Sequence, residues 1–261
     1  MVVDRDKLLE EASFTRFCKF VLGWDYFLLL KENSQKKLQC KTINDDGVGV
    51  AEDDDHHDAN DSAIDLRKVK NSYKDVDDYL STFEPLLFEE VKAHITQSKD
   101  DEEVAGWVMR LVMECNEVDG FLLPSVTYVN DEEEKISQND LLLVSREKFS
   151  SDTRKLPTTY AFALVEHHQR NLLRLRMYLG GEIKNLTMET GEVSQRLLNM
   201  RALITSSLDP QNKRLFSLKI CSLSTIFREY SALRSIGSLP FKDLILQAAY
   251  TVSNADDHTW R

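Results

Sequence analysis

The spacing of hydrophobic positions predicts a helix at the start of the chain. Within the first segment, about residues 4–31, five apolar side chains follow the i, i+3, i+4, i+7 and i+8 spacing of one buried helical face: Phe14, Phe17, Cys18, Val21 and Leu22. The stretch "GWDYFLLL" then adds a bulky apolar patch around Trp24 and Tyr26. We therefore expect residues 1–32 to form an N-terminal helical unit.

A second helical pattern follows at Pro85. Proline suits the first turn of a helix, and Leu87, Val91 and Ile95 continue an apolar stripe after it. We expect residues 67–103 to be a helical region whose main helix begins at Pro85.

The period then changes from 3.6 to 2, which is typical of strands. In "WVMRLVMEC", alternate residues from Trp107 to Cys115 share one face, with Arg110 and Glu114 on the opposite face. Further strands are expected in "FLLPSVTYV", "DLLLVS", "TYAFALVEHH", "LLRLRMYL" and "RLFSLKI", separated by turn-like or acidic pieces. Short strands at this spacing predict a compact antiparallel barrel or sandwich over residues 104–221.

Helical patterns interrupt and follow these strands. "GEVSQRLLNMRALITSS" is the expected helical insertion, and "PFKDLILQAAY" is a last short helix. Between them, "SLSTIFREYSALRSIGSLP" begins with Ser/Thr, ends at Gly237, and carries the apolar stripe Ile226, Phe227, Tyr230 and Leu233. The predicted class is therefore α+β, with a small antiparallel β-barrel placed between helices.

The strand "NLLRLRMYL" has two chemically different faces. Leu173, Leu175, Met177 and Leu179 fall on one side, whereas Arg174, Arg176 and Tyr178 fall on the other. Cations can meet phosphates, and a tyrosine ring can stack on a base. The alternative is that both arginines pair with acidic groups on neighbouring strands. The strand pattern does not choose between these hypotheses.

Charge is divided unevenly along the chain. The net charge is −11, but residues 1–144 have a balance of −17 and residues 145–261 a balance of +6. Nine acidic residues and no Lys or Arg lie between Asn44 and Asp65, so we expect residues 33–66 to be a disordered acidic linker. Its "DDDHHD" is a poor metal site, because ligands need a rigid frame.

Sequence motifs for catalysis are missing. The sequence contains no G-x-x-x-x-G-K-[ST], G-x-G-x-x-G, G-x-S-x-G or H-E-x-x-H pattern. His167 and His168 are neighbours on one predicted strand and point oppositely, and Glu166 beside them has no evident acid–base partner. We therefore expect no metal, no cofactor and no catalytic residue in this chain.

Targeting signals are equally sparse. The start "MVVDRDKLLEEA" is acidic where a signal peptide is basic, and no apolar run reaches the roughly 20 residues that span a bilayer. The four cysteines have no paired spacing, which favours buried thiols over disulfides. "RKVK" is a weak candidate for a nuclear address. We expect no membrane association and a nuclear location, with a cytoplasmic pool as the alternative.

Several long stretches resemble one known family. "YKDVDDYLSTFEPLLFEEVKA", "NDLLLVS", "VEHHQRNLLRLRMYL", "NMRALITSS" and "RLFSLKICSLSTIFREYSALRSIGSLPFKDLI" are similar to the region that precedes the motor in senataxin-type and plant MAGATAMA-type superfamily-1 helicases. The resemblance covers most of residues 67–250 and also "FCKFVLGWDY", whereas residues 33–65 have no counterpart in it.

The resemblance implies an architecture and a role. It implies a brace in residues 1–32, a two-helix stalk formed by the helix from Pro85 and the helix Ser224–Ile236, and a β-barrel placed over the nucleic-acid channel of a RecA-like motor. Residues 222–261 would lead toward that motor. The family unwinds RNA–DNA hybrids with ATP and Mg, but the residues of its ATPase have no position in this sequence.

Two functions of different classes follow from these observations. The first is an accessory module that positions RNA or an RNA/DNA hybrid against RecA-like motor domains, with contacts at Arg170, Arg174, Arg176, Tyr178 and Lys219. The second is a protein–protein interaction module or a truncated product without nucleic-acid affinity, using the apolar stripes of the two stalk helices.

Overall fold

The computed structural model describes residues 5–45, 66–97, 106–128, 135–149, 156–181, 193–206 and 213–247. The predicted α+β class is confirmed, because these residues form six antiparallel strands and six α-helices. The helices are α1 (Arg5–Gly23), α2 (Tyr26–Asp45), α3 (Val76–Gln97), α4 (Gln195–Thr205), α5 (Ser224–Ser235) and α6 (Lys242–Leu246). The strands are β1 (Val108–Val118), β2 (Phe121–Tyr128), β3 (Asp140–Ser145), β4 (Tyr160–Gln169), β5 (Leu172–Arg176) and β6 (Arg214–Ser222).

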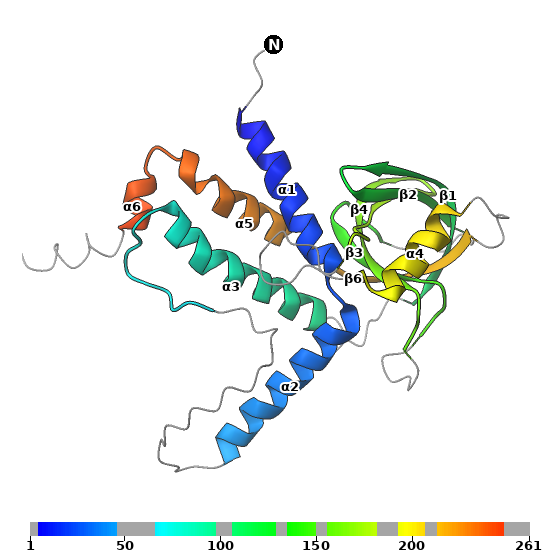
Figure 1. Cartoon of the computed structure of the whole chain (residues 1–261), viewed down its shortest axis with the longest axis horizontal. Helices are drawn as coiled ribbons and strands as arrows, with labels where there is room; N and C mark the ends of the chain where they lie inside the picture. The colour runs from blue at the N-terminus through cyan, green and yellow to red at the C-terminus, as the bar shows by residue number, and fades with distance from the viewer. Residues whose placement is uncertain are drawn as a thin grey trace, which may run out of the picture.

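The strands form a sheet that closes on itself. Their hydrogen-bonded order is β1-β2-β5-β4-β3-β6, and β6 pairs back to β1 through partners such as Met109 and Phe216. Two tight hairpins, β1–β2 and β4–β5, require left-handed backbone at Asp119, Gly120 and Arg170. Figure 1 shows the closed sheet on one side of the molecule, with α4 across it, and α1, α3 and α5 on the other side.

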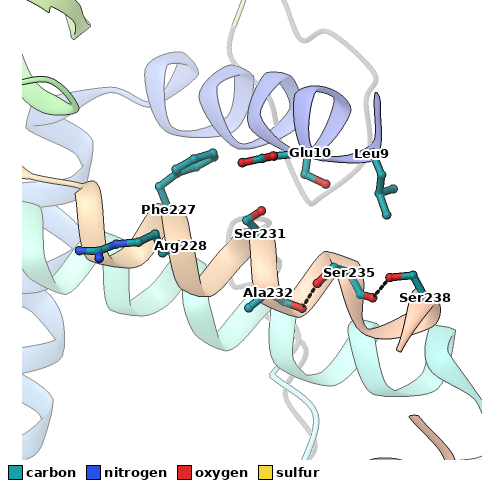
Figure 2. Close-up of a pocket in the computed structure, with 9 residues that line it drawn as sticks. Leu9, Glu10, Phe227, Arg228, Ser231, Ala232, Ser235 and Ser238 are labelled. Carbon is teal, nitrogen blue, oxygen red and sulfur yellow. Dashed lines mark hydrogen bonds between the residues drawn. The ribbon is translucent and has the colours of Figure 1, made fainter. Parts of the chain in front are cut away.

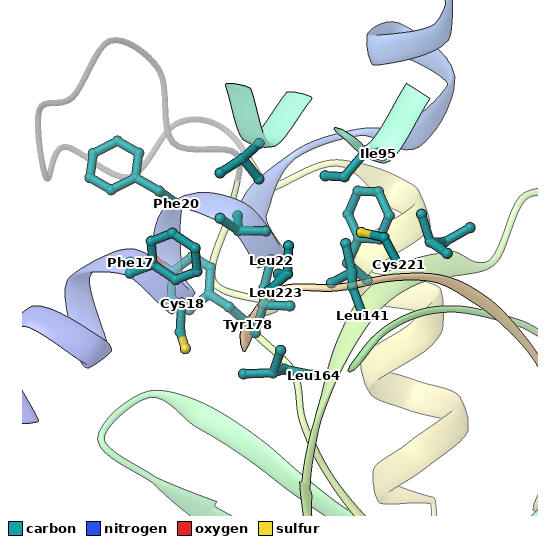
Figure 3. Close-up of a cluster of buried hydrophobic side chains, with 14 of the residues drawn as sticks. Phe17, Cys18, Phe20, Leu22, Ile95, Leu141, Leu164, Tyr178, Cys221 and Leu223 are labelled. Carbon is teal, nitrogen blue, oxygen red and sulfur yellow. The ribbon is translucent and has the colours of Figure 1, made fainter. Parts of the chain in front are cut away.

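Two hydrophobic clusters use opposite faces of the sheet. The inward cluster contains Leu142, Val144, Leu173, Leu175 and Met177, and α4 adds apolar residues to it. The outward cluster joins the sheet to α1, α3 and α5, and Figure 3 shows its buried side chains meeting where α1 reaches the strands. Strand β3 is buried along its whole length because its two faces belong to different clusters.

The N-terminal prediction is confirmed in its core and wrong in its boundaries. The stripe around Phe17, Cys18 and Val21 is buried as expected. However, helix α1 ends at Gly23 and α2 continues to Asp45, so residues 33–45 are helical and not part of an acidic linker. Residues 46–65, including "DDDHHD", lie outside the described part of the chain.

Helix α3 begins earlier than predicted. It starts at Val76, so Pro85 lies inside the helix and not in its first turn. A proline inside a helix costs one backbone hydrogen bond. Here Pro85 is buried with Phe88, Val91 and Ile95, and this tertiary packing overrides the local preference.

Strand β1 turns Arg110 into the closed sheet and Met113 toward solvent. Val108, Arg110 and Val112 are buried, whereas Met113 on the other face is 59% exposed. The guanidinium of Arg110 is fully buried, donates from Nε to Oγ of Ser217 at 2.5 Å, and lies 4.4 Å from the ring centroid of Tyr128. Polar and aromatic partners inside the sheet therefore accommodate the cation of Arg110.

A buried carboxylate ties three helices together. Glu84 of α3 accepts hydrogen bonds from Nε of Arg16 on α1 at 3.0 Å and from the hydroxyl of Tyr230 on α5 at 2.7 Å. The guanidinium of Arg234 on α5 lies 3.9 Å away. Burial and this carboxylate raise the pKa of Tyr230, so the hydroxyl remains a donor.

A second carboxylate fixes the helices to the sheet. Asp25, between α1 and α2, accepts a hydrogen bond from the hydroxyl of Tyr160 on β4 at 2.8 Å and pairs with Nε of Arg196 on α4 at 2.8 Å. It also caps α2 by accepting from the backbone N–H groups of Phe27 and Leu28. One side chain thus sets the position of α2, β4 and α4.

Candidate nucleic-acid interface

The predicted contact residues lie mainly on the β4–β5 hairpin. Gln169 pairs with Leu172, so Arg170 and Asn171 form a two-residue turn, and Arg170 has a φ of 51°. Arg170 is exposed at the tip of this hairpin. Its position is compatible with a phosphate contact from solvent.

Both arginines of β5 form ion pairs with one carboxylate. Nε of Arg174 lies 3.2 Å from Oε2 of Glu166 on β4, and Nε of Arg176 donates to Oε1 of the same residue at 2.6 Å. The side chain of Arg174 remains 44% exposed, whereas that of Arg176 is 21% exposed. The interstrand pairing that we posed as the alternative to phosphate binding is therefore present in the structure.

Helix α1 covers the outward face of β5 beyond Arg174. The guanidinium carbon of Arg176 lies 5.2 Å from the ring centroid of Phe14 and 4.8 Å from that of Phe121. Tyr178, expected on a solvent-facing side, is only 5% exposed and packs edge-on against Phe121. Burial raises the pKa of Tyr178. The tyrosine ring is part of the core in this structure, so its expected solvent-facing placement is wrong.

Lys219 lies on a different part of the sheet. Strands β4 and β3 separate β5 from β6, so the structure does not bring Lys219 together with the arginines. Its ammonium lies 2.7 Å from Oδ2 of Asp140 and donates to the carbonyl of Lys135 at 2.9 Å. Asp140 is 1% exposed, which gives this lysine a role in holding β3 and β6 together.

The histidine pair does not form a metal or acid–base site with Glu166. A bulge between Val165 and His167 changes the alternation of β4, and both ring nitrogens of His168 lie 3.0 Å from backbone carbonyls, those of Ile136 and Arg170. Glu166 is bonded to the two arginines. Within the described ranges, no three Cys, His, Asp or Glu side chains converge as a metal site.

A groove of about 440 Å³ lies between α1 and α5. Figure 2 shows Glu10 of α1 opposite Ser231 of α5, Leu9 near Ser235 and Ser238, and Phe227 at the other end. The hydroxyl of Ser235 donates to the carbonyl of Ala232 within the helix. These side chains do not combine a nucleophile with a base, so the groove offers packing surface and no evident chemistry.

The apolar stripes of the second hypothesis are largely used inside the chain. Val91, Ile95, Ile226 and Tyr230 are all buried in the cluster that joins the helices to the sheet. Leu87 and Phe227 pack against that cluster, and Leu233 is half-buried. Among the described residues, most of the two stripes is therefore used to pack the helices on one another and on the sheet, which leaves little of these stripes for a partner.

Sequence reasoning missed the cations at the opposite end of the sheet from the β4–β5 hairpin. Arg146 and Lys148 follow β3, Arg214 begins β6, and all three are exposed. The alternation of Arg214 and Phe216 in "RLFSLKI" was the available signal, but only the pairing of β6 with β1 and β3 shows which residues surround it.

None of the described helices has the length and hydropathy to cross a bilayer.

Comparison with known proteins shows that the chain is similar to part of a probable helicase. No protein-family model matches the chain. The chain is 51% identical over 268 aligned residues to "Probable helicase MAGATAMA 3" of Arabidopsis thaliana, and the match covers all of this chain and 30% of that protein. The chain thus spans about a third of the relative's length. This similarity is consistent with an N-terminal region of a MAGATAMA-type helicase, and it confirms the resemblance carried by the separate sequence segments.

Proposed function

We propose that this chain is an accessory region of an ATP-dependent RNA/DNA helicase and helps to position nucleic acid against RecA-like motor domains. The observation that carries the proposal is the identity of 51% over the whole chain to a probable helicase. In this proposal the closed sheet is the β-barrel of the resemblance, α3 and α5 are its stalk, and α1 is its brace. ATP and Mg²⁺ act in the motor and are not bound by residues of this chain.

The geometry supports a rigid positioning element. Glu84 joins α1, α3 and α5, and Asp25 joins the helices to β4 and α4. A strand of nucleic acid held on the sheet would therefore have a defined position relative to the helices. Such pre-organisation is what a positioning role requires, because flexible attachment would spend binding energy on ordering.

The five sequence-predicted residues enter the proposal unequally. Arg170 and Arg174 are exposed and are available as phosphate contacts, whereas Arg176, Tyr178 and Lys219 face protein groups. If Arg174 and Arg176 each neutralised one phosphate, replacing both with Ala would flatten the dependence of log K on log salt by roughly 1.4. Their pairing with Glu166 predicts a change of about 0.7 or less.

Equilibrium binding tests the proposal directly. The chain is titrated into fluorescein-labelled RNA, DNA and RNA/DNA hybrid from about 50 to 200 mM salt, and fluorescence anisotropy is recorded. We expect binding that weakens linearly on a log–log plot as salt rises. Sedimentation at several protein concentrations controls for self-association. Absence of binding to all three ligands at the lowest salt would refute a direct role in positioning nucleic acid.

A further inference from the structure

The outer surface of β1 and β6 carries a row of half-buried apolar side chains. Leu215 and Ser217 of β6 are fully buried, so Phe216 between them points outward. Its register partner on β1 is Met109, and both side chains are half-buried. Leu111, opposite Arg214, continues the row. We call Met109, Leu111, Arg214 and Phe216, together with Arg146 and Lys148, the β1/β6 face.

Three exposed cations border this row. Ser145 pairs with Phe216, which places the segment after β3 beside the ring, and Nζ of Lys148 lies 5.4 Å from the ring centroid of Phe216. Arg146 and Arg214 belong to the same end of the sheet. Among the described residues, no carboxylate forms an ion pair with Arg146, Lys148 or Arg214.

This arrangement contrasts with the cations that the sequence pattern favoured. Arg174 and Arg176 share the carboxylate of Glu166, and Lys219 has Asp140. On the β1/β6 face, Glu147 is the carboxylate on the same short segment as Arg146 and Lys148, and within the described part of the chain its side chain forms no hydrogen bond or ion pair with either of them. Cations that form no ion pair with any described carboxylate, beside a half-buried ring, form a local positive surface on a protein whose net charge is −11.

We propose that the β1/β6 face binds single-stranded nucleic acid, with phosphates at Arg146, Lys148 and Arg214 and one base stacked on Phe216. This inference rests on the proposed function and deepens it by naming the strand's path. Charge complementarity favours a polyanion over an apolar protein partner. The partly accessible ring of Phe216 favours a single strand over a duplex, because paired bases do not offer their faces for stacking.

Two variants separate the electrostatic contacts from the stacking contact. The first, Arg146→Gln/Lys148→Gln/Arg214→Gln, removes three charges from the face, and its matched control Lys31→Gln/Lys68→Gln/Lys74→Gln removes three exposed charges from the helical side. The second, Phe216→Leu, keeps an apolar side chain but removes the ring, and Phe216→Tyr restores a ring. Thermal melting of each variant verifies that the fold is intact.

Anisotropy with a fluorescein-labelled 12-nucleotide RNA, and the same DNA sequence in parallel, gives the readout. The face variant should flatten the salt slope by about 2, at roughly 0.7 per contact, while the matched control keeps the wild-type slope. Phe216→Leu should weaken binding about tenfold, and Phe216→Tyr should bind as the wild type does. A wild-type slope in the face variant, with unchanged affinity in Phe216→Leu, overturns this inference and leaves the proposed function standing. Failure of the wild-type chain to bind any strand overturns both.

Discussion

Removing the Glu84 carboxylate should weaken the packing of α1, α3 and α5 on one another and lower the free energy of unfolding. Its side chain is 8% exposed, and it accepts hydrogen bonds from Arg16 at 3.0 and 3.3 Å and from Tyr230 at 2.7 Å. Burial alone would lower the pKa of Arg16, but the hydrogen-bonded carboxylate raises it overall. Glu84→Ala would remove the carboxylate that accepts hydrogen bonds from the guanidinium of Arg16 and the phenol of Tyr230.

The magnitude follows from the burial of the two partners. Breaking a fully buried ion pair costs about 3–5 kcal/mol. Because the side chain of Arg16 is 22% exposed, water relieves part of this cost, and we expect Glu84→Ala to lower the free energy of unfolding by about 2–4 kcal/mol. Glu84→Gln keeps the shape and one acceptor oxygen for Tyr230, so it should lose about 1–2 kcal/mol.

Urea denaturation followed by far-ultraviolet circular dichroism measures these differences, provided that the slope with denaturant is unchanged. The control is Glu117→Ala, because Glu117 forms a two-point ion pair with Arg201 in which the side chains are 49% and 37% exposed. Exposed pairs contribute little, so this variant should unfold close to the wild type. Equal losses from Glu84→Ala and Glu117→Ala would refute the claim that the buried carboxylate holds the helices together.

Three further predictions test other parts of the structure. Asp25→Ala should lower the free energy of unfolding by about 2–4 kcal/mol in the same urea assay, because the cap of α2 and the bonds to Tyr160 and Arg196 are lost together. A loss of less than about 0.5 kcal/mol would contradict this prediction. Burial alone would raise the pKa of Glu89, but hydrogen bonds from Lys36 and Lys92 hold this pKa below its ordinary value of 4.5. The ion pairs of Glu89 therefore stabilise the fold fully above pH 4.5, and this stabilisation is lost as the pH falls through the pKa of the folded state. Glu89→Gln should accordingly reduce the difference in stability between neutral and acidic pH, and an unchanged difference would count against the pairing. Burial raises the pKa of the Cys18 and Cys221 thiols from 9.0 to about 12. At pH 8 both thiols should therefore be alkylated about a thousandfold more slowly in the folded chain than in urea. Peptide mass spectrometry measures these rates, and equal rates would show that the thiols are accessible in the folded chain.

Local pattern predicted the elements well because most of them bury one face. All six strands lie where alternation placed them, and the helices around Gln195 and Ser224 begin within a few residues of the predicted positions. The pattern failed where tertiary contacts outweigh local preference. Pro85 lies inside α3 because it packs in a core, and α2 continues through polar residues that periodicity alone does not distinguish from a linker.

The candidate site was harder to predict because a strand pattern shows which residues share a face but not what covers that face. The outward face of β5 was expected to meet solvent, yet α1 covers Arg176 and Tyr178 there. The alternation in β1 showed which residues share a face but not which face is buried, and in the structure Met113 is exposed and Arg110 lies inside. Only strand order and register decide such questions, and these depend on contacts between residues far apart in the sequence.

A row of arginines on a strand therefore has to be weighed against its carboxylates before it is assigned to a polyanion. Each guanidinium that already meets a carboxylate must give up that bond, or share it, when a phosphate arrives, and the exchange returns little free energy. Glu166 imposes this exchange on Arg174 and Arg176, and Asp140 imposes it on Lys219. Among the described residues, Arg146, Lys148 and Arg214 have no carboxylate to give up when they meet phosphates, and Lys148 gives up only its contact with the ring of Phe216. The release of counterions, which is the favourable term in nucleic-acid binding, is therefore offset less at these three cations. If this chain binds a nucleic-acid strand, Arg146, Lys148 and Arg214 should consequently contribute more to the salt dependence of the affinity than Arg174 and Arg176, although the sequence pattern made the latter two more conspicuous.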